Sequence, residues 1–222
     1  MGDINQLDFI RAHRDRFEAP VLEVGSHDYG STQNIRGLFS GADYTGIDMN
    51  PGPGVDLALD LTRPFEEIDA ALEGQRFGTI FCLSVLEHCD QPFVMADSMT
   101  RLLVPGGQIY LSVPFAWKFH GYPSDYWRFT HEGVKKLFPG LLFNGELDDL
   151  STPRHHERRP LDDDIGLIPM SSKWHRAQGR PMRAVSVSLL RMLAKLGVLR
   201  WLAGYRYVMM PSMINMIGTK PR

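Results

Sequence analysis

The fold of this chain is decided by residues 21–30, which read VLEVGSHDYG. A short run that suits a buried strand enters a turn bounded by Gly25 and Gly30, and residues 31–39 can form a helix directly after it. A strand, a glycine turn and a helix in this order direct backbone N–H groups toward a ligand. The stretch therefore predicts the first unit of an α/β fold and a binding site at its turn.

The same alternation continues along the chain. The predicted strands are 21–24, 44–48, 55–59, 79–84, 108–113, 141–147 and 213–219, and the predicted helices are 4–17, 31–39, 92–103, 130–138 and 184–203. Residues 79–84 are rich in Ile, Phe and Leu, as buried parallel strands are. Strands that alternate with helices are typical of a doubly wound parallel sheet. We therefore expect an α/β fold.

The length predicts a single domain over 1–222, because 222 residues suffice for one well-buried α/β core and are short for two. Residues 148–212 interrupt the alternation with a polar, proline-punctuated stretch and then a basic helical segment. We interpret them as an insertion or lid before the last strand. All 26 Asp and Glu residues precede residue 165, whereas ten of the 24 Lys and Arg residues follow it, so an acidic body carries a basic segment, 165–222.

Cysteine use and hydropathy indicate the compartment. Cys82 and Cys89 have no CxxC or Cys/His ligand spacing around them, which argues against a disulfide framework and a structural zinc site. The first residues lack the apolar stretch of a secretory signal, and no run of eighteen apolar residues occurs. We expect a cytoplasmic protein, and we predict no metal site.

Two glycine-loop interpretations compete at the turn. The GxxxxG spacing is that of a phosphate-binding loop, but the lysine that such loops require is missing. The turn also reads like GxGxxG with His27 in place of the middle glycine. Glu23, two residues before Gly25, would repel a pyrophosphate but favours a ligand with an ammonium or sulfonium charge. The sequence therefore favours S-adenosylmethionine over a nicotinamide dinucleotide.

Four blocks in order carry a family resemblance. They are LEVGSHDYG at 22–30, YTGID at 44–48, FCLSVLEH at 81–88 and LLVPGGQIYLSVP at 102–114. The region 21–114 resembles the class I S-adenosylmethionine-dependent methyltransferases, of the methyltransferase type 11 kind. The resemblance implies a Rossmann-like, mostly parallel sheet of seven strands with an antiparallel last strand, and S-adenosyl-L-methionine as the cofactor.

The resemblance also implies which residues hold that cofactor. They are Glu23, Gly25, Ser26, His27 and Gly30 around its methionine part, Asp48 and Met49 after the second strand, Asp60 and Leu61 at the adenine, and Ser84 and Val85 after the fourth strand. Asp48 lies at a spacing from the glycine turn that suits an acid bonded to ribose hydroxyls. His27 departs from the family, which usually has glycine at this position. A histidine would resist the backbone conformation there if the position needs a positive φ.

Methyl transfer to a hydroxyl needs a positioned base as well as the methyl donor. The candidates after the fourth and fifth strands include His88, His120 and Asp125, with Tyr126 and His131 also open. We favour His120 as the base, with Asp125 orienting it, and keep His88 as the alternative. A structural alternative is a loop in which Asp125 pairs with Arg128 and the aromatic side chains only pack.

The aromatic loop 115–129 suits a flat ring or a sugar face, so the predicted acceptor is a hydroxyl of a small-molecule, sugar or glycan-type compound. We expect no nucleic-acid partner. The basic segment 165–222 leaves open a peripheral membrane contact, packing on this domain, or a homodimer. Two other functions remain alternatives: an NAD-dependent oxidoreductase, and a catalytically inactive cofactor-binding partner subunit.

Overall fold

A computed structural model describes residues 5–30, 35–121, 123–154, 156–161, 167–202 and 204–222. The chain divides into two compact units. The first comprises Met1–Leu161 with Pro211–Arg222, and the second comprises Asp162–Met210. The predicted insertion, 148–212, extends over parts of both units, and its boundaries stay a prediction.

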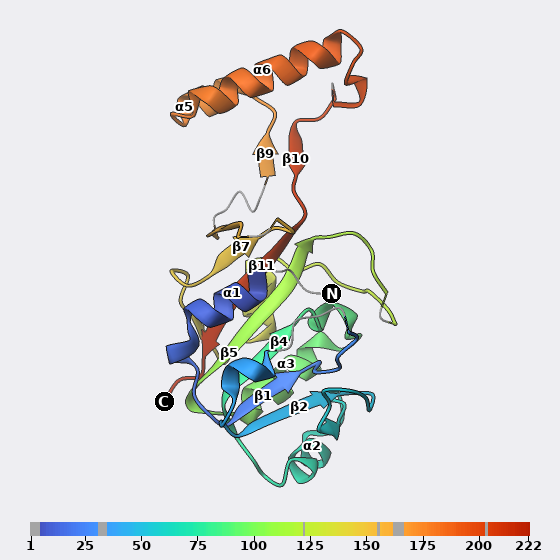
Figure 1. The fold of residues 1–222 in the computed structure, drawn as a ribbon, viewed down its shortest axis with the longest axis vertical. Helices are drawn as coiled ribbons and strands as arrows, with labels where there is room; N and C mark the ends of the chain where they lie inside the picture. Colours follow the sequence, from blue (N-terminus) through green and yellow to red (C-terminus); the bar gives the residue numbers. More distant parts are fainter. Residues whose placement is uncertain (1–4, 31–34, 122, 155, 162–166, 203) are drawn as a thin grey trace. The chain divides into compact units, whose positions relative to one another are not determined.

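The first unit is built on one sheet of mixed direction (Figure 1). Its long strands are β1 (Val21–Val24), β2 (Tyr44–Asp48), β4 (Phe77–Leu83), β5 (Leu103–Ala116) and β11 (Ser212–Thr219), and its short ones are β3 (Leu57–Ala58), β6 (Leu142–Phe143), β7 (Asp149–Ser151) and β8 (Arg158–Pro160). The order is β3-β2-β1-β4-β5-β11-β7-β8, with β6 also paired to β11. β1 to β5 are parallel and β11 is antiparallel to β5, which confirms the predicted mostly parallel sheet and its antiparallel last strand.

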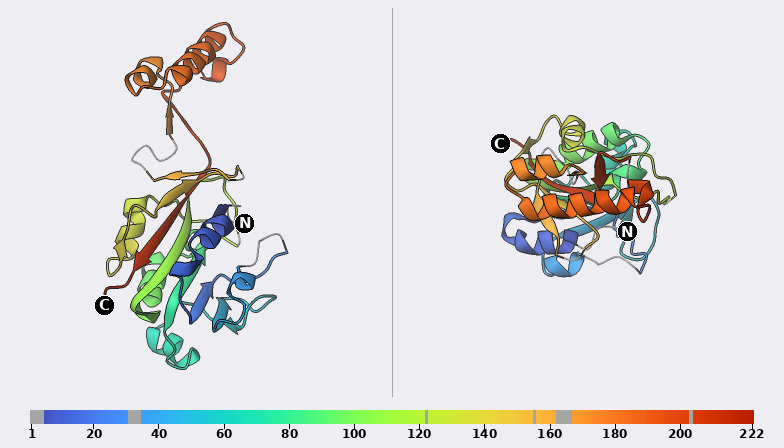
Figure 2. Two further views of the ribbon diagram at one scale, coloured as in Figure 1. Left: turned by 60° about the vertical axis from the view of Figure 1, so that its left-hand side comes forward. Right: turned by 90° about the horizontal axis from the view of Figure 1, so that it is seen from above.

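Helices cover both faces of this sheet (Figures 1 and 2). On one face α1 (Asn5–Ala12) places Phe9 against Tyr110 of β5, with stacked ring centroids 4.6 Å apart. On the other face lie α3 (Pro92–Leu102), which begins with proline in its first turn, and α4 (His131–Leu137), which Thr130 caps by accepting the Gly133 N–H. β4 is buried along nearly its whole length because it lies between β1 and β5 under both layers. A further helix, α2 (Phe65–Ala71), leads into β4.

Several predicted elements differ in extent. The described part of the sheet has nine strands instead of seven, because residues 142–160 contribute three short strands. The predicted strands 55–59 and 141–147 are reduced to two residues each. The predicted helix 4–17 ends at Ala12 and is followed by a 3₁₀ turn, Arg14–Arg16. Of the predicted helix 31–39, residues 31–34 lie outside the described residues, and Arg36–Phe39 form a 3₁₀ helix.

The described part of the second unit consists of two helices, a 3₁₀ turn and a two-stranded sheet. β9 (Leu167–Pro169) pairs antiparallel with β10 (Tyr207–Met209), and between them lie α5 (Ser172–Ala177), α6 (Pro181–Lys195) and a 3₁₀ turn, Arg200–Leu202. α6 begins at Pro181, earlier than the predicted start at residue 184, because proline is well tolerated in a first helical turn. Among the residues the structure describes, no helix combines the length and the apolar character needed to cross a membrane.

Candidate active site

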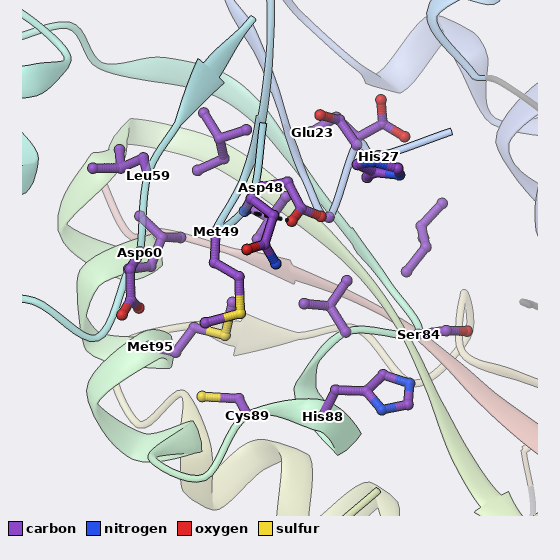
Figure 3. Close-up of a pocket in the computed structure, with 18 of the residues that line it drawn as sticks. Glu23, His27, Asp48, Met49, Leu59, Asp60, Ser84, His88, Cys89 and Met95 are labelled. Carbon is purple, nitrogen blue, oxygen red and sulfur yellow. Dashed lines mark hydrogen bonds between the residues drawn. The ribbon is translucent and has the colours of Figure 1, made fainter. Parts of the chain in front are cut away.

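A cavity of about 980 Å³ opens at the carboxyl ends of β1, β2 and β4 (Figure 3). The strand order reverses between β1 and β4, and ligands of open α/β sheets bind at such a reversal. The cavity is lined by ten of the eleven predicted cofactor residues, namely Glu23, Gly25, Ser26, His27, Asp48, Met49, Asp60, Leu61, Ser84 and Val85. Gly30 is not part of its lining. The volume is at the upper end of the range of small-molecule sites.

The glycine turn fits closely against the end of β4. Gly25 has φ +78°, and a Cβ atom there would lie 2.3 Å from Cγ2 of Val85. Only glycine satisfies both the positive φ and this contact. The expected conflict at His27 does not arise, because His27 is absent from the described non-glycine residues with positive φ. Its ring instead lies against Gly52, in the loop after β2. A Cβ atom at Gly52 would lie 2.0 Å from Nε2 of His27, so the glycine makes room for the imidazole.

Glu23 brings a half-buried carboxylate to the first strand end. Its Oε2 accepts a hydrogen bond of 2.6 Å from the hydroxyl of Tyr44 on β2. Burial raises the pKa of Glu23, while the Tyr44 hydrogen bond and the charge of Arg36 act in the opposite direction. A carboxylate that has lost solvent in this way gains from a cationic ligand group.

Asp48 and Asp60 each present one oxygen to the cavity wall and keep the other available. Asp48 Oδ1 accepts the Asn50 N–H at 3.0 Å. Asp60 Oδ1 accepts both the N–H and the hydroxyl of Thr62, at 2.8 and 2.7 Å. Among the residues described, no protein donor reaches the Oδ2 atom of Asp48 or of Asp60. Beside these acids, the Met49 side chain points toward Met95 (Figure 3). Two carboxylate oxygens next to an apolar surface suit hydroxyl and amine donors on a nucleoside.

The fourth strand ends in a strained residue. Ser84 has φ +56°, which is uncommon for a residue with a side chain, and such conformations concentrate at binding sites. The side-chain amide of Gln6, on α1, donates to the hydroxyls of Ser84 at 3.2 Å and of Ser112 at 2.8 Å. Gln6 also lines the cavity, and our sequence interpretation missed it. The signal was weak: Gln6 lies on the buried face of α1 with Phe9 and Ile10, but Asn5 is a second polar residue buried in this helix.

The aromatic loop is held by one carboxylate. Asp125 Oδ2 accepts from the main-chain N–H of His120 at 2.8 Å and lies 3.0 Å from His120 Nδ1. Arg128 donates to both oxygens of Asp125, at 2.5 and 2.7 Å, and holds the pKa of that acid well below its usual range. The two alternatives for Asp125, pairing with His120 and pairing with Arg128, therefore occur together. Neither His120 nor Asp125 lines the cavity, whereas His88 does (Figure 3).

Glu87 precedes His88 in the 3₁₀ turn Leu86–His88 and does not line the cavity. Its side chain is fully buried, and neither oxygen has a hydrogen-bond partner among the described residues. Oε1 lies 3.9 Å from Nε2 of His88 and 3.9 Å from Nε2 of His120. Burial raises the pKa of Glu87 to about 8. The sequence placed Glu87 beyond the cofactor residues but gave no sign that His120 would meet it.

Comparison with known proteins gives relatives over part of the chain. The ubiquinone biosynthesis O-methyltransferase of Stutzerimonas stutzeri is 32% identical over 162 residues, which are 64% of this chain and 69% of that protein. The protein of the same name from Xanthomonas oryzae pv. oryzae is 28% identical over 116 residues, 48% of each chain. The chain thus spans about half the length of the Xanthomonas relative and about two thirds of the Stutzerimonas relative. No family model matches the chain.

A solved structure extends the likeness in fold over nearly the whole chain. A SAM-dependent methyltransferase from Archaeoglobus fulgidus superposes with a TM-score of 0.56 and 15% identity, covering 97% of this chain and 93% of that one. The strand order, the cavity at its reversal and the Stutzerimonas relative all agree with the four sequence blocks. They remove the NAD-dependent oxidoreductase from the alternatives. The chain belongs to the class I S-adenosylmethionine-dependent methyltransferases.

Proposed function

We propose that this chain transfers the methyl group of S-adenosylmethionine to a hydroxyl oxygen of a small-molecule acceptor. The observation that carries the proposal is the single cavity edge on which Glu23, Asp48 and Asp60 gather from the ends of three strands. When bound, the cofactor supplies an electrophilic methyl group on a sulfonium. The chain's own residues bind and orient it and receive the acceptor.

The acidic side chains of the cavity fit this cofactor part by part. Glu23 takes the ammonium group, because a carboxylate whose pKa is raised by lost solvent gains from a cation beside it. Asp48 accepts from the ribose hydroxyls through Oδ2, since its Oδ1 is engaged by Asn50. Asp60 accepts from the adenine amine, with Leu61 beside it in the cavity wall. Three acids at three places match the three hydrogen-bond donor groups of the cofactor.

The acceptor approaches beside His88. The hydroxyl oxygen must lie in line behind the methyl group, and its proton must leave during the reaction. His88 lines the cavity together with Gly121, Ser124 and Tyr126 of the aromatic loop. The buried position of His120 supports a role behind His88, with Asp125 holding the loop in place. The proton therefore passes to His88 or to solvent on the His88 side of the cavity.

The acceptor class follows from the relatives and the lining. Relatives named for ubiquinone biosynthesis support a small molecule with a hydroxyl acceptor. Tyr126 and Tyr29 line the cavity and can pack on a flat ring. A sugar or glycan-type acceptor is a narrower proposal that rests on the aromatic loop alone. The cytoplasm stays the proposed location, and a membrane contact or homodimer through 165–222 stays a separate proposal.

Calorimetric titration tests the cofactor assignment. We expect S-adenosylhomocysteine to bind the wild-type chain and NADH not to bind. Asp48→Ala removes a carboxylate that accepts from the ribose, so the Kd should rise about 10- to 100-fold, as for hydrogen bonds to charged groups of about 1.5–3 kcal/mol. Asp97→Asn, at an exposed acid on α3, is the matched control and should leave the Kd unchanged.

Two results would change the proposal. Preference for NADH, or equal binding by Asp48→Ala, would overturn the cofactor assignment. Strong S-adenosylhomocysteine binding without product, when a panel of hydroxylated rings and sugars is analysed by mass spectrometry, would favour the inactive partner subunit.

A further inference from the structure

Glu87, His88 and His120 form a compact cluster next to the cavity, which we call the ligand cluster. Their donor atoms all lie within 4.8 Å of one another. The separation of 3.9 Å between Glu87 Oε1 and each Nε2 is too long for a hydrogen bond. Donors around a tetrahedral ion with bonds of about 2.0–2.1 Å lie roughly 3.4 Å apart. We propose that the ligand cluster binds a divalent transition metal ion of the zinc type.

Both imidazoles are held in the orientation that such an ion requires. His88 Nδ1 lies 2.5 Å from the Ser124 carbonyl oxygen, which can only accept, so Nδ1 carries the proton. His120 Nδ1 lies 3.0 Å from Asp125, a carboxylate that Arg128 keeps ionised, so this Nδ1 also donates. Each Nε2, 3.9 Å from Glu87 Oε1, is therefore left as the nitrogen with the lone pair. Metal-binding histidines are anchored in the same way by an acceptor on the second ring nitrogen.

The state of Glu87 gives an independent argument. Two nitrogen lone pairs face a carboxylate oxygen that no donor reaches among the residues described. A proton cannot bridge gaps of this length, and an uncompensated buried charge is costly. A cation between the three atoms satisfies all of them at once, after each moves inward by a few tenths of an ångström.

The chemistry of the donors selects the metal. Two imidazole nitrogens and one carboxylate suit zinc, iron and related transition metals, whereas magnesium and calcium prefer oxygen donors. Three protein ligands leave one position of a tetrahedral ion for a solvent or acceptor oxygen. His88 and His120 then act as ligands instead of free bases. The inference rests on the cluster's geometry, and it holds whether or not the proposed methyl transfer is correct.

Metal titration tests the inference without any activity assay. The untagged full chain is dialysed against a chelator and titrated with zinc by calorimetry, and with cobalt by its visible absorption. We expect one ion per chain. Glu87→Gln and His120→Ala should each abolish stoichiometric binding, and Asp125→Asn, which changes an anchor, should weaken it about 10- to 100-fold. His131→Gln, at a partly buried histidine outside the cluster, should bind as the wild type does.

A parallel titration with S-adenosylhomocysteine shows which variants are folded. Zinc binding lost in Glu87→Gln while S-adenosylhomocysteine still binds would support the ion. Absence of stoichiometric zinc binding by the wild type, or equal binding by Glu87→Gln, would overturn it and leave Glu87 as a neutral buried acid. A wild type that binds zinc but not S-adenosylhomocysteine would refute the proposed cofactor and still support the metal site.

Discussion

Replacing Gly25 with alanine measures how tightly the glycine turn is packed against the end of β4. The left-handed backbone at φ +78° costs an alanine about 1–2 kcal/mol. Its Cβ atom would lie 2.3 Å from Val85 Cγ2, and overpacking of this kind costs about 1–3 kcal/mol more. We therefore expect Gly25→Ala to lower the free energy of unfolding by about 2–5 kcal/mol.

Gly30 provides a matched control. It has φ +74°, but no atom of the residues that the structure describes lies within 4 Å of a Cβ placed there. Gly30→Ala should therefore show only the backbone cost, about 1–2 kcal/mol. The difference between the two variants isolates the contact with Val85.

Urea denaturation followed by tryptophan fluorescence measures these free energies, and a double-mutant cycle with Val85→Ala identifies the contact. Val85→Ala removes Cγ2, the atom that the new Cβ at position 25 would meet. In the Gly25→Ala background its effect on the free energy of unfolding should therefore be more favourable by about 1–3 kcal/mol than in the wild type. Equal losses in Gly25→Ala and Gly30→Ala, or no coupling with Val85→Ala, would refute the close packing of the turn.

Two titrating positions give predictions that depend on pH. Burial raises the pKa of Asp148 to about 6, from an ordinary value of 3.8. Below about pH 4 the Asp148 carboxyl is protonated in both the folded and the unfolded chain. The wild type therefore loses free energy of unfolding as the pH rises from about 4 through about 6. Measured by denaturant titration, the advantage of Asp148→Asn over the wild type should grow by roughly 3 kcal/mol between pH 4 and pH 8. Tyr44→Phe removes the hydrogen bond that lowers the pKa of Glu23, so the Kd for S-adenosylhomocysteine should rise about tenfold at pH 7 and less at pH 8.5. An unchanged gap for Asp148→Asn, or a Tyr44→Phe effect that grows with pH, would contradict these assignments.

Strands that are buried between neighbours could be predicted to within a residue or two. The predictions 21–24 and 44–48 coincide with β1 and β2. β1 pairs with β2 and β4 along its whole length, and β2 pairs with β1 over four of its five residues. β3 is shorter than its pattern because it pairs only with β2, over two residues at the sheet edge. β5 is longer than predicted, because a register shift opposite Phe77 and Thr79 accommodates the Pro105–Gly107 turn within the strand. The local sequence determines the propensity of a segment to form a strand, whereas pairing with distant strands determines how long that strand becomes.

The same distinction separates the two halves of the site. The family resemblance implied Glu23, Asp48 and Asp60, and these three residues line one cavity because parallel strands bring their carboxyl ends to one edge of the sheet. The meeting of Glu87 with His120 follows from loop geometry instead. That loop is fixed by hydrogen bonds from His120 and Arg128 to Asp125, and by the Ser124 carbonyl at His88. No periodicity encodes such contacts, so the sequence could name the histidines as candidates but could not bring their Nε2 atoms to one buried carboxylate.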